Sequence, residues 1–252
     1  MSLHPNFNAS SLRTRFQHAS LAVLTTLLAV WGIRAASALE ASETDPRRAA
    51  VVMLEGTAEC TIGGVTKPAD LGTLLPPGST VKTGKKSEVV LFFRQVGTMV
   101  RLRPNTTLGI ETMTKFVQDE VLLKETVLDL KEGGMMCVVR VLDERSKFEV
   151  KFPGYSATFD GAGMGRFDLN AKGTILVGKR SERSLRVVSA AQPDKLIMVP
   201  PGQYFTRGND LPAVASEQLL KKVRPNLDKL ESLARALTPP PRPEELPRLK
   251  RK

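Results

Sequence analysis

Histidine, cysteine and aromatic residues are scarce in this chain of 252 residues. His4 and His18 are the only histidines, and both precede an apolar run near the N-terminus. Histidine is the commonest acid–base residue and a frequent metal ligand, so its absence from the rest of the chain disfavours Ser–His and Cys–His catalysis and histidine metal sites. We therefore predict a protein that is not an enzyme and uses no cofactor or metal.

A carboxylate-based hydrolase is the enzymatic alternative that the residues leave open. Acidic residues stand close together at Asp119–Glu120 and Asp143–Glu144, and Asp160 and Asp168 flank a glycine-rich stretch. A cleft holding two carboxylates about 5–9 Å apart would favour this alternative. Glycine spacing in that stretch, Gly161–Gly165, does not match a dinucleotide fingerprint, so we expect a turn or bulge where two segments approach closely.

Cysteine usage is limited to Cys60 and Cys137, both on predicted strands. In an exported protein these two residues could form one disulfide. The other interpretation is a pair of buried, small hydrophobic side chains. Both interpretations stay open at this point, because bonded cysteines need Cα atoms within about 7 Å of each other.

Long apolar runs are also missing: Leu21–Ile33 is uncharged but too short for a membrane span of about 20 residues. A polar segment with arginines and no acid precedes it, and Ala36–Ser37–Ala38 follows. This order is typical of a secretory signal and predicts a signal peptide at residues 1–38, which places the protein in the periplasm or outside the cell. The alternative is an uncleaved inner-membrane anchor at residues 19–38, the only case in which we expect membrane contact.

Residues 49–210 are divided by turn residues into short β-prone runs, such as Val89–Phe93 and Phe148–Phe152. We predict an all-β domain there, built of stacked short antiparallel strands in a solenoid-like or sandwich-like arrangement. Lys115–Leu130 is ambiguous between a helix and strands, and its composition favours strands. Two related phrases, PPGSTVKTG at 76–84 and PPGQYFTRG at 200–208, each begin with a stiff proline–glycine turn.

The segments on either side of the β domain differ from it in amino-acid composition. Residues 39–48 form a polar lead-in, and residues 238–252 are a proline-rich, basic tail that we expect to be extended or disordered. Residues 211–237 are predicted to be a helical segment, with the helix over Ala213–Leu237 and an apolar stripe at spacings of three and four from Leu219 to Leu237. We expect this apolar stripe to pack on the β domain, and Pro225 to split or kink the helix.

A net charge of +11 points to anionic partners. Six cations close together in sequence are a candidate basic binding face: Lys82, Lys85, Lys86, Arg94, Arg101 and Arg103. The alternative is a scattered, solvated surface. The alternation after residue 98 places Met99 and Arg101 on one face of a strand and Val100 and Leu102 on the other. Nucleic acid is not expected as a partner, because no zinc motif, RNP-like strand or basic helix-turn-helix pattern occurs.

Several phrases follow one another in an order that resembles the FecR domain family of exported β-domain proteins. They are VVMLEGTAEC (51–60), LPPGSTVKTGKKSEVVLFF (75–93), VGTMVRLRPNTTLGIE (96–111), VLDLKEGGMMCVV (127–139), KFEVKFPGYSATFDGAGMGRFDLN (147–170), ILVGKRSERSLRVVS (175–189) and IMVPPGQYFTRG (197–208). The resemblance implies a β domain outside the cytoplasm. Family members that regulate sigma factors also carry a cytoplasmic anti-sigma segment, for which the polar residues before the apolar run are too few.

These observations together predict an exported, non-catalytic protein that binds a protein or an anionic envelope polymer outside the cytoplasm. The alternative is a membrane-anchored signalling component related to sigma-factor regulation.

Overall fold

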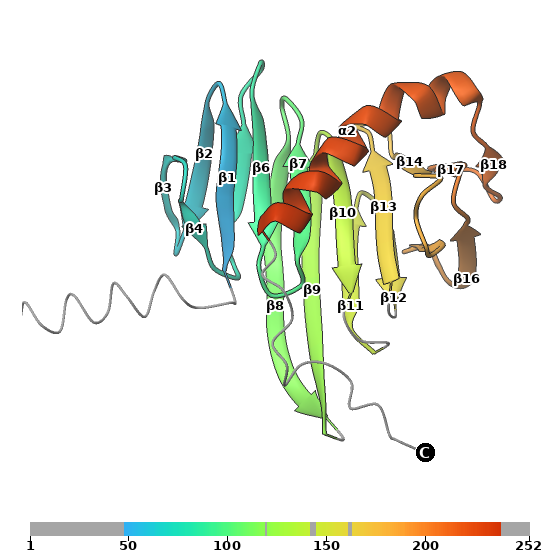
Figure 1. Cartoon of the computed structure of the whole chain (residues 1–252), viewed down its shortest axis with the longest axis horizontal. Coiled ribbons are helices and arrows are strands. Elements are labelled where there is room, and N and C mark those ends of the chain that lie inside the picture. The colour runs from blue at the N-terminus through green and yellow to red at the C-terminus, as the bar shows by residue number, and fades with distance from the viewer. Residues whose placement is uncertain (1–47, 119, 142–144, 161–162, 238–252) are drawn as a thin grey trace, which may run out of the picture. The chain divides into compact units, whose positions relative to one another are not determined.

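The computed structural model describes residues 48–118, 120–141, 145–160 and 163–237 (Figure 1). Within these ranges the strands form two nine-stranded sheets, and one helix follows them. The predicted signal peptide at 1–38, nearly all of the polar lead-in at 39–48 and the tail at 238–252 lie outside the described residues. Across the part of the chain that is described, no helix combines the length and apolar character that a membrane crossing needs.

The chain passes repeatedly between the two sheets, so the order of strands in space differs from their order in the chain. From edge to edge, sheet A contains β18 (Ala213–Val214), β17 (Gln203–Thr206), β14 (Thr174–Val177), β13 (Gly163–Leu169), β10 (Met135–Val141), β7 (Thr98–Leu102), β6 (Glu88–Phe93), β1 (Ala49–Glu55) and β4 (Leu74–Leu75). Sheet B contains β16 (Gln192–Val199), β15 (Leu185–Ser189), β12 (Tyr155–Asp160), β11 (Lys147–Phe152), β9 (Val121–Glu132), β8 (Thr107–Gln118), β5 (Thr80–Thr83), β2 (Ala58–Ile62) and β3 (Val65–Pro68).

The main core lies between the two sheets, which confirms the all-β prediction in its sandwich-like form. Alternate side chains of both sheets point into one cluster of buried apolar residues, as in β11, where Phe148, Val150 and Phe152 are buried and the intervening residues are more exposed. The same alternation in β7 sends Val100 and Leu102 into this cluster and Met99 to the opposite face, as predicted. The period-2 pattern of the sequence therefore sets which face of each strand is buried.

One strand pairing departs from the predicted antiparallel arrangement. β9 and β11 pair in parallel, with Phe148 beside Thr126 and Val150 beside Leu128. The chain crosses from sheet B to β10 in sheet A and back between these strands, so it re-enters sheet B in the same direction. A parallel pair requires such a crossover connection, and here a strand of the opposite sheet supplies it in place of a helix.

The two proline–glycine phrases form the same type of turn at the start of two strands. The amide of Ser79 donates to the carbonyl of Pro76, and the amide of Gln203 donates to that of Pro200. In each turn the third residue, Gly78 or Gly202, has a positive φ near 80°. This geometry is that of a type II turn, where glycine avoids steric strain. The first phrase leads into β5 of sheet B and the second into β17 of sheet A.

The ambiguous segment Lys115–Leu130 is β-structure rather than a helix. β8 and β9 pair antiparallel along their full length, with Phe116 beside Leu123. They extend beyond the neighbouring strands at one end of the sheets (Figure 1). The composition of this segment, with its three valines, Phe116 and Thr126, therefore predicted its structure better than its weak helical periodicity.

A close approach explains Gly165, within the glycine-rich stretch. A Cβ at this position would lie 2.5 Å from the ring of Phe159. Phe159 belongs to β12 in sheet B and Gly165 to β13 in sheet A, so the glycine lets an aromatic ring fill the space between the sheets. The neighbouring residues 161 and 162 lie outside the described ranges.

The C-terminal helix α2 (Glu217–Leu237) packs on the outer face of sheet A and crosses β7, β10 and β13 (Figure 1). A second apolar cluster joins the two, with Phe92, Met99 and Val138 from the sheet and Leu227 and Leu230 from the helix among its members. This packing confirms the expectation that the leucine stripe covers the β domain. It leaves the opposite side of α2 exposed and charged.

Two details of the predicted helix are corrected. The helix begins at Glu217 rather than at Ala213, because Ala213 and Val214 pair with β17. Ser216 then caps it, since its hydroxyl accepts the amide of Leu219 at 3.3 Å. Pro225 does not split the helix, which is continuous to Leu237. The proline faces solvent on the exposed side of α2, so its ring disturbs no packing against the sheet.

Candidate functional site: a basic-rimmed groove beside α2

The structure does not gather the six predicted basic residues into one face. Lys82 is exposed on β5 in sheet B, and Lys85 and Lys86 lie in the turn that follows it. Arg94 lies in the turn after β6, at the far end of that strand from Lys86, a separation of about 20 Å at ~3.3 Å per residue. These four cations therefore cannot contact one small anionic group together.

The other two predicted cations, Arg101 and Arg103, bind side chains of the protein itself. Arg101 Nε donates to Glu88 Oε2 at 3.0 Å, and its Nη1 donates to Asn226 Oδ1 of α2 at 3.1 Å. Arg103 Nη2 lies 2.6 Å from Asp168 Oδ1. Burial raises the pKa of Asp168, and Arg103 opposes that rise. Both arginines thus stabilise the outer face of sheet A.

Both cysteines are free, buried thiols in different sheets. Cys60 lies on β2 of sheet B and Cys137 on β10 of sheet A, and both point into the core between the sheets. Burial raises the pKa of the Cys137 thiol well above its usual range, and the nearby carboxylate of Asp168 adds to the rise. A thiol that stays protonated is a poor nucleophile and a poor metal ligand, so Cys137 packs as a hydrophobic side chain.

The predicted acidic pairs give no described cleft. Asp119, Asp143 and Glu144 lie outside the described residues, and Asp168 is bound by Arg103. In the described ranges no group of three or more His, Cys, Asp or Glu side chains comes together as a metal site would require.

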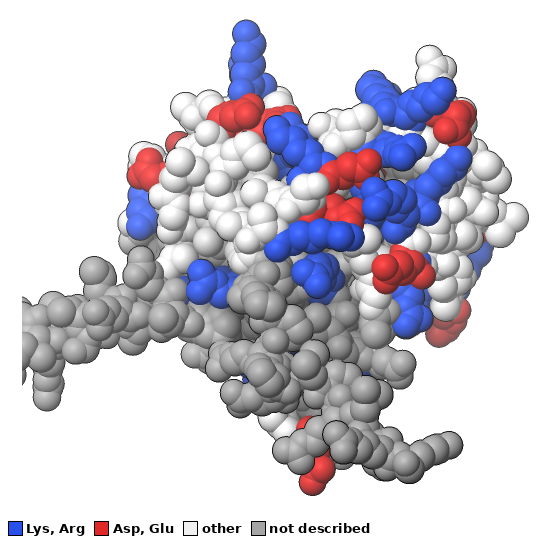
Figure 2. All heavy atoms as spheres, in the orientation of Figure 1, with Lys and Arg blue, Asp and Glu red and all other residues white. Residues whose placement is uncertain are grey.

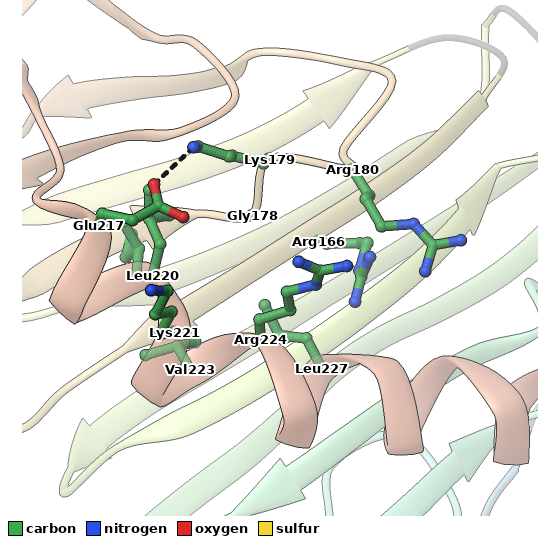
Figure 3. A pocket seen from close by; sticks show the side chains of 11 residues that line it. Arg166, Gly178, Lys179, Arg180, Glu217, Leu220, Lys221, Val223, Arg224 and Leu227 are labelled. Carbon is green, nitrogen blue, oxygen red and sulfur yellow. Dashed lines mark hydrogen bonds and ion pairs between the residues drawn. The ribbon is translucent and has the colours of Figure 1, made fainter.

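A groove of about 270 Å³ runs along the first three turns of α2, where the helix passes the end of β14 (Figure 3). Its floor is apolar and is built by Leu176 from the sheet and by Leu220, Val223 and Leu227 from the helix. Gly178 forms part of the wall. A Cβ there would lie 3.2 Å from Leu227 and 3.4 Å from Arg166, so the missing side chain lets the helix and the strand approach closely.

Cations surround this apolar floor. The loop after β14 contributes Lys179 and Arg180, and α2 contributes Lys221 and Arg224. Arg166, from β13, lines the inner wall. These side chains come from β13, the loop after β14 and α2, and Figure 3 shows them around the groove, with Lys179 reaching Glu217.

The surface around the groove is the most charged part of the side of the molecule on which α2 lies. Figure 2 shows blue side chains gathered over α2 and the strands beside its N-terminal half, with red ones between them, whereas the area over β1 and β6 is mostly uncharged. The loop at 178–184 and α2 together hold eight cations and four acids. We call this surface, made of residues 178–184 and the exposed side of α2, the α2 face.

Arg166 is the deepest cation of the groove, with a side chain only 2% exposed. It binds Asp228 of α2, and its Nη1 lies 3.3 Å from Glu231 Oε2. Burial acts to raise the pKa of Asp228, but the hydrogen bond and charge of Arg166, helped by Arg180 and Arg224, hold that pKa below its usual range. Much of the charge on this inner wall is therefore neutralised by the helix.

At the outer rim of the groove, the charged side chains are more exposed than at the inner wall. Lys179 Nζ donates to Glu217 Oε2 at 2.8 Å, a contact that joins the loop after β14 to the first turn of α2 (Figure 3). Both side chains are about 60% exposed. This hydrogen bond lowers the pKa of Glu217, and the charges of Lys179 and Lys221 add to the effect. Within the described ranges, Lys221 makes no ion pair, although it lies four residues beyond Glu217 on the same side of the helix.

Sequence reasoning missed this groove, although part of its signal is visible. The run KRSER at 179–183 has four charged residues of five, and Lys221 and Arg224 immediately follow the stripe residues Leu220 and Val223. The sequence does not indicate that Gly178 and Arg166 lie against the turns of α2 that contain Lys221 and Arg224. Only the packing of α2 on sheet A brings them together.

No protein-family model, curated protein or solved structure matches this chain.

Proposed function

We propose that this chain is an exported, non-catalytic FecR-like domain protein that binds an anionic partner, a protein segment or an envelope polymer, outside the cytoplasm. The α2 face is the site that best supports this proposal, because cations from the loop at 178–184 and from α2 gather there around an apolar groove. A surface of one predominant sign attracts polymers of the opposite sign and raises their association rate.

The order of phrases that resembles the FecR family and the signal-like N-terminus support the location. A membrane-anchored signalling component related to sigma-factor regulation is the second candidate. It is favoured by the same apolar run, Leu21–Ile33, if that run is retained as an anchor.

Two measurements test the location. The native chain is expressed in a Gram-negative host, the cell is fractionated, and the N-terminus of the recovered protein is sequenced. We expect a periplasmic or secreted protein that begins after Ala38. Recovery from the cytoplasm with Met1 intact would exclude export, and recovery from the inner membrane with residues 19–38 retained would favour the signalling candidate.

Binding is tested with poly-L-glutamate and with alginate, a carboxylated polysaccharide, at several salt concentrations. The variant Lys222→Glu/Lys229→Glu changes two exposed cations of α2 that do not line the groove. It should weaken binding about tenfold or more at low salt, and the effect should shrink at high salt. The control Lys131→Glu/Lys172→Glu makes the same charge change away from α2 and should weaken binding much less. Equal losses in the two variants would show that net charge, rather than the α2 face, attracts the polymer.

A further inference from the structure

The groove beneath the α2 face differs from the rest of that face in having an apolar floor. Leu176, Leu220, Val223 and Leu227 line it, and because they pack in the cluster between α2 and sheet A they are only 1–7% exposed, so each presents a narrow edge to the groove. A purely polar polymer would leave these exposed edges without an apolar partner. The chemistry of the floor therefore points to a ligand that carries an apolar group as well as a negative charge.

The volume limits the size of that apolar group. The groove holds about 270 Å³. A water-sized group takes roughly 30 Å³ of liquid volume, so about nine methylene-sized groups would fill it. This volume is just below the usual range for ligand pockets, about 300–1,000 Å³, so the groove is too small for a lipid with two full-length chains.

The rim indicates where the negative charge would lie. Asp228 and Glu231 already neutralise Arg166 at the inner wall. Among the described residues, Lys179 is paired only with Glu217, an exposed carboxylate of the protein itself, and Lys221 lies beside this pair. The first turn of α2 adds the positive end of the helix dipole at the same point. Glu217 thus occupies the position that a ligand carboxylate would take.

Building on the proposed function, on which this inference rests, we infer that the groove binds a carboxylate attached to an apolar chain of about eight to ten carbons. The chain lies on the floor built by Leu176, Leu220, Val223 and Leu227. The carboxylate binds Lys179 and Lys221 and displaces Glu217, which covers Lys179 when the groove is empty. A free carboxylic acid and an apolar acidic end of a larger envelope molecule share this chemistry.

The probe is sodium decanoate below its micelle concentration, titrated into the full-length exported protein by calorimetry, with decanol and decyltrimethylammonium as neutral and cationic controls. We expect saturable 1:1 binding of decanoate, binding of decanol that is at least fivefold weaker, and no saturable binding of the cation. A decanoyl-capped acidic peptide tests the larger source. Binding of the peptide but not of the free acid assigns the site to an acylated molecule, and the reverse assigns it to a free acid.

Three variants separate the ligand site from a structural role. Glu217→Gln removes the internal competitor and should tighten decanoate binding about three- to fivefold, whereas a merely structural ion pair would give no gain. Lys221→Gln should weaken binding about fivefold. Val223→Phe fills the floor and should abolish decanoate binding while polymer binding persists, and its thermal unfolding is measured to confirm that it folds.

The results distinguish this inference from the proposed function. If decanoate and the capped peptide both fail to bind while the polymers bind and Lys222→Glu/Lys229→Glu weakens them, the groove assignment is wrong and the proposed function stands. If decanoate binds but neither polymer does, the proposed polymer partner is wrong. Equal affinity for decanoate and decanol would contradict the carboxylate position at Lys179 and Lys221.

Discussion

The guanidinium of Arg166, on β13, donates a hydrogen bond to the carboxylate of Asp228, on α2, 62 residues later in the chain. Arg166 is almost fully buried, so its charge is neutralised by the helix rather than by water. The apolar cluster under α2 accounts for the attraction between helix and sheet, whereas this directional pair also determines which turn of α2 lies over β13. That turn is the one that closes the groove.

Replacing Arg166 by Met should destabilise the protein. The change removes the partner that sheet A gives Glu231, which is itself only 6% exposed, and leaves it with Arg235 of the same helix at 2.6 Å. Breaking a buried pair from one side costs about 3 kcal/mol. Urea unfolding would measure the loss, with Lys131→Met as an exposed control that should stay within about 0.5 kcal/mol of the parent. The double variant Arg166→Met/Glu231→Leu should recover part of the loss, and no recovery would contradict the pairing.

Asp228 should make the attachment of α2 sensitive to acid. Because its pKa is lower in the folded protein than in the unfolded chain, its stabilising contribution is complete above the unfolded value of about 3.9 and is lost as the pH falls through the folded value. The stability difference between the parent and Asp228→Asn should therefore be constant from pH 7 to pH 5 and shrink below pH 4. Asp168, whose pKa is raised, acts with the opposite sign, so only this difference isolates Asp228. Unfolding curves at each pH provide the measurement.

Gly165→Ala should destabilise the space between the sheets. The added methyl group would come within 2.5 Å of the buried Phe159 ring, which other core residues hold in place. Overpacking of this kind costs about 1–3 kcal/mol. Gly109→Ala is the matched control, since its nearest neighbour would be 3.6 Å away. In a double-mutant cycle, Phe159→Leu should offset part of the cost, and strictly additive effects would show that the two residues do not interact.

The two thiols should be unreactive in the folded protein. Cys60 and Cys137 are both buried, and burial keeps the Cys137 thiol protonated at neutral pH. A chromogenic thiol reagent at pH 8 should modify neither residue within an hour in native buffer. In guanidinium chloride without reductant it should modify both. Detection of no thiol under those denaturing conditions would mean that the two residues are bonded.

Local pattern was enough to predict many elements of the fold. The alternation in Phe148–Phe152 and in Met99–Arg103 predicted which side chains face the core, because the side-chain period of a strand is fixed by backbone geometry. The spacing of leucines after residue 213 predicted an amphipathic helix that packs on the β domain. Proline and glycine at 76–78 and 200–202 predicted the two turns, since both residue types restrict the backbone locally.

The site could not be predicted in the same way. The apolar–basic alternation predicted Arg101 and Arg103 to be cations at the surface. In the structure they bind Glu88 and Asp168, because α2 covers the outer face of sheet A. The parallel pairing of β9 and β11 likewise depends on the route of the chain through the opposite sheet. Neither fact has a local signal, because both arise from contacts between segments distant in sequence.

The sequence by itself determined the strand and helix content, the faces of the strands, the turns and the positive charge of the chain, since each follows from backbone preference or composition. Only the tertiary structure decided where that charge is available. Packing α2 across sheet A buries Arg166 against Asp228 and Glu231 and leaves Lys179 and Lys221 at the rim of an apolar groove. Whether a lysine or arginine can bind a ligand depends on the acids that folding places beside it, and those acids lie tens of residues away in the chain.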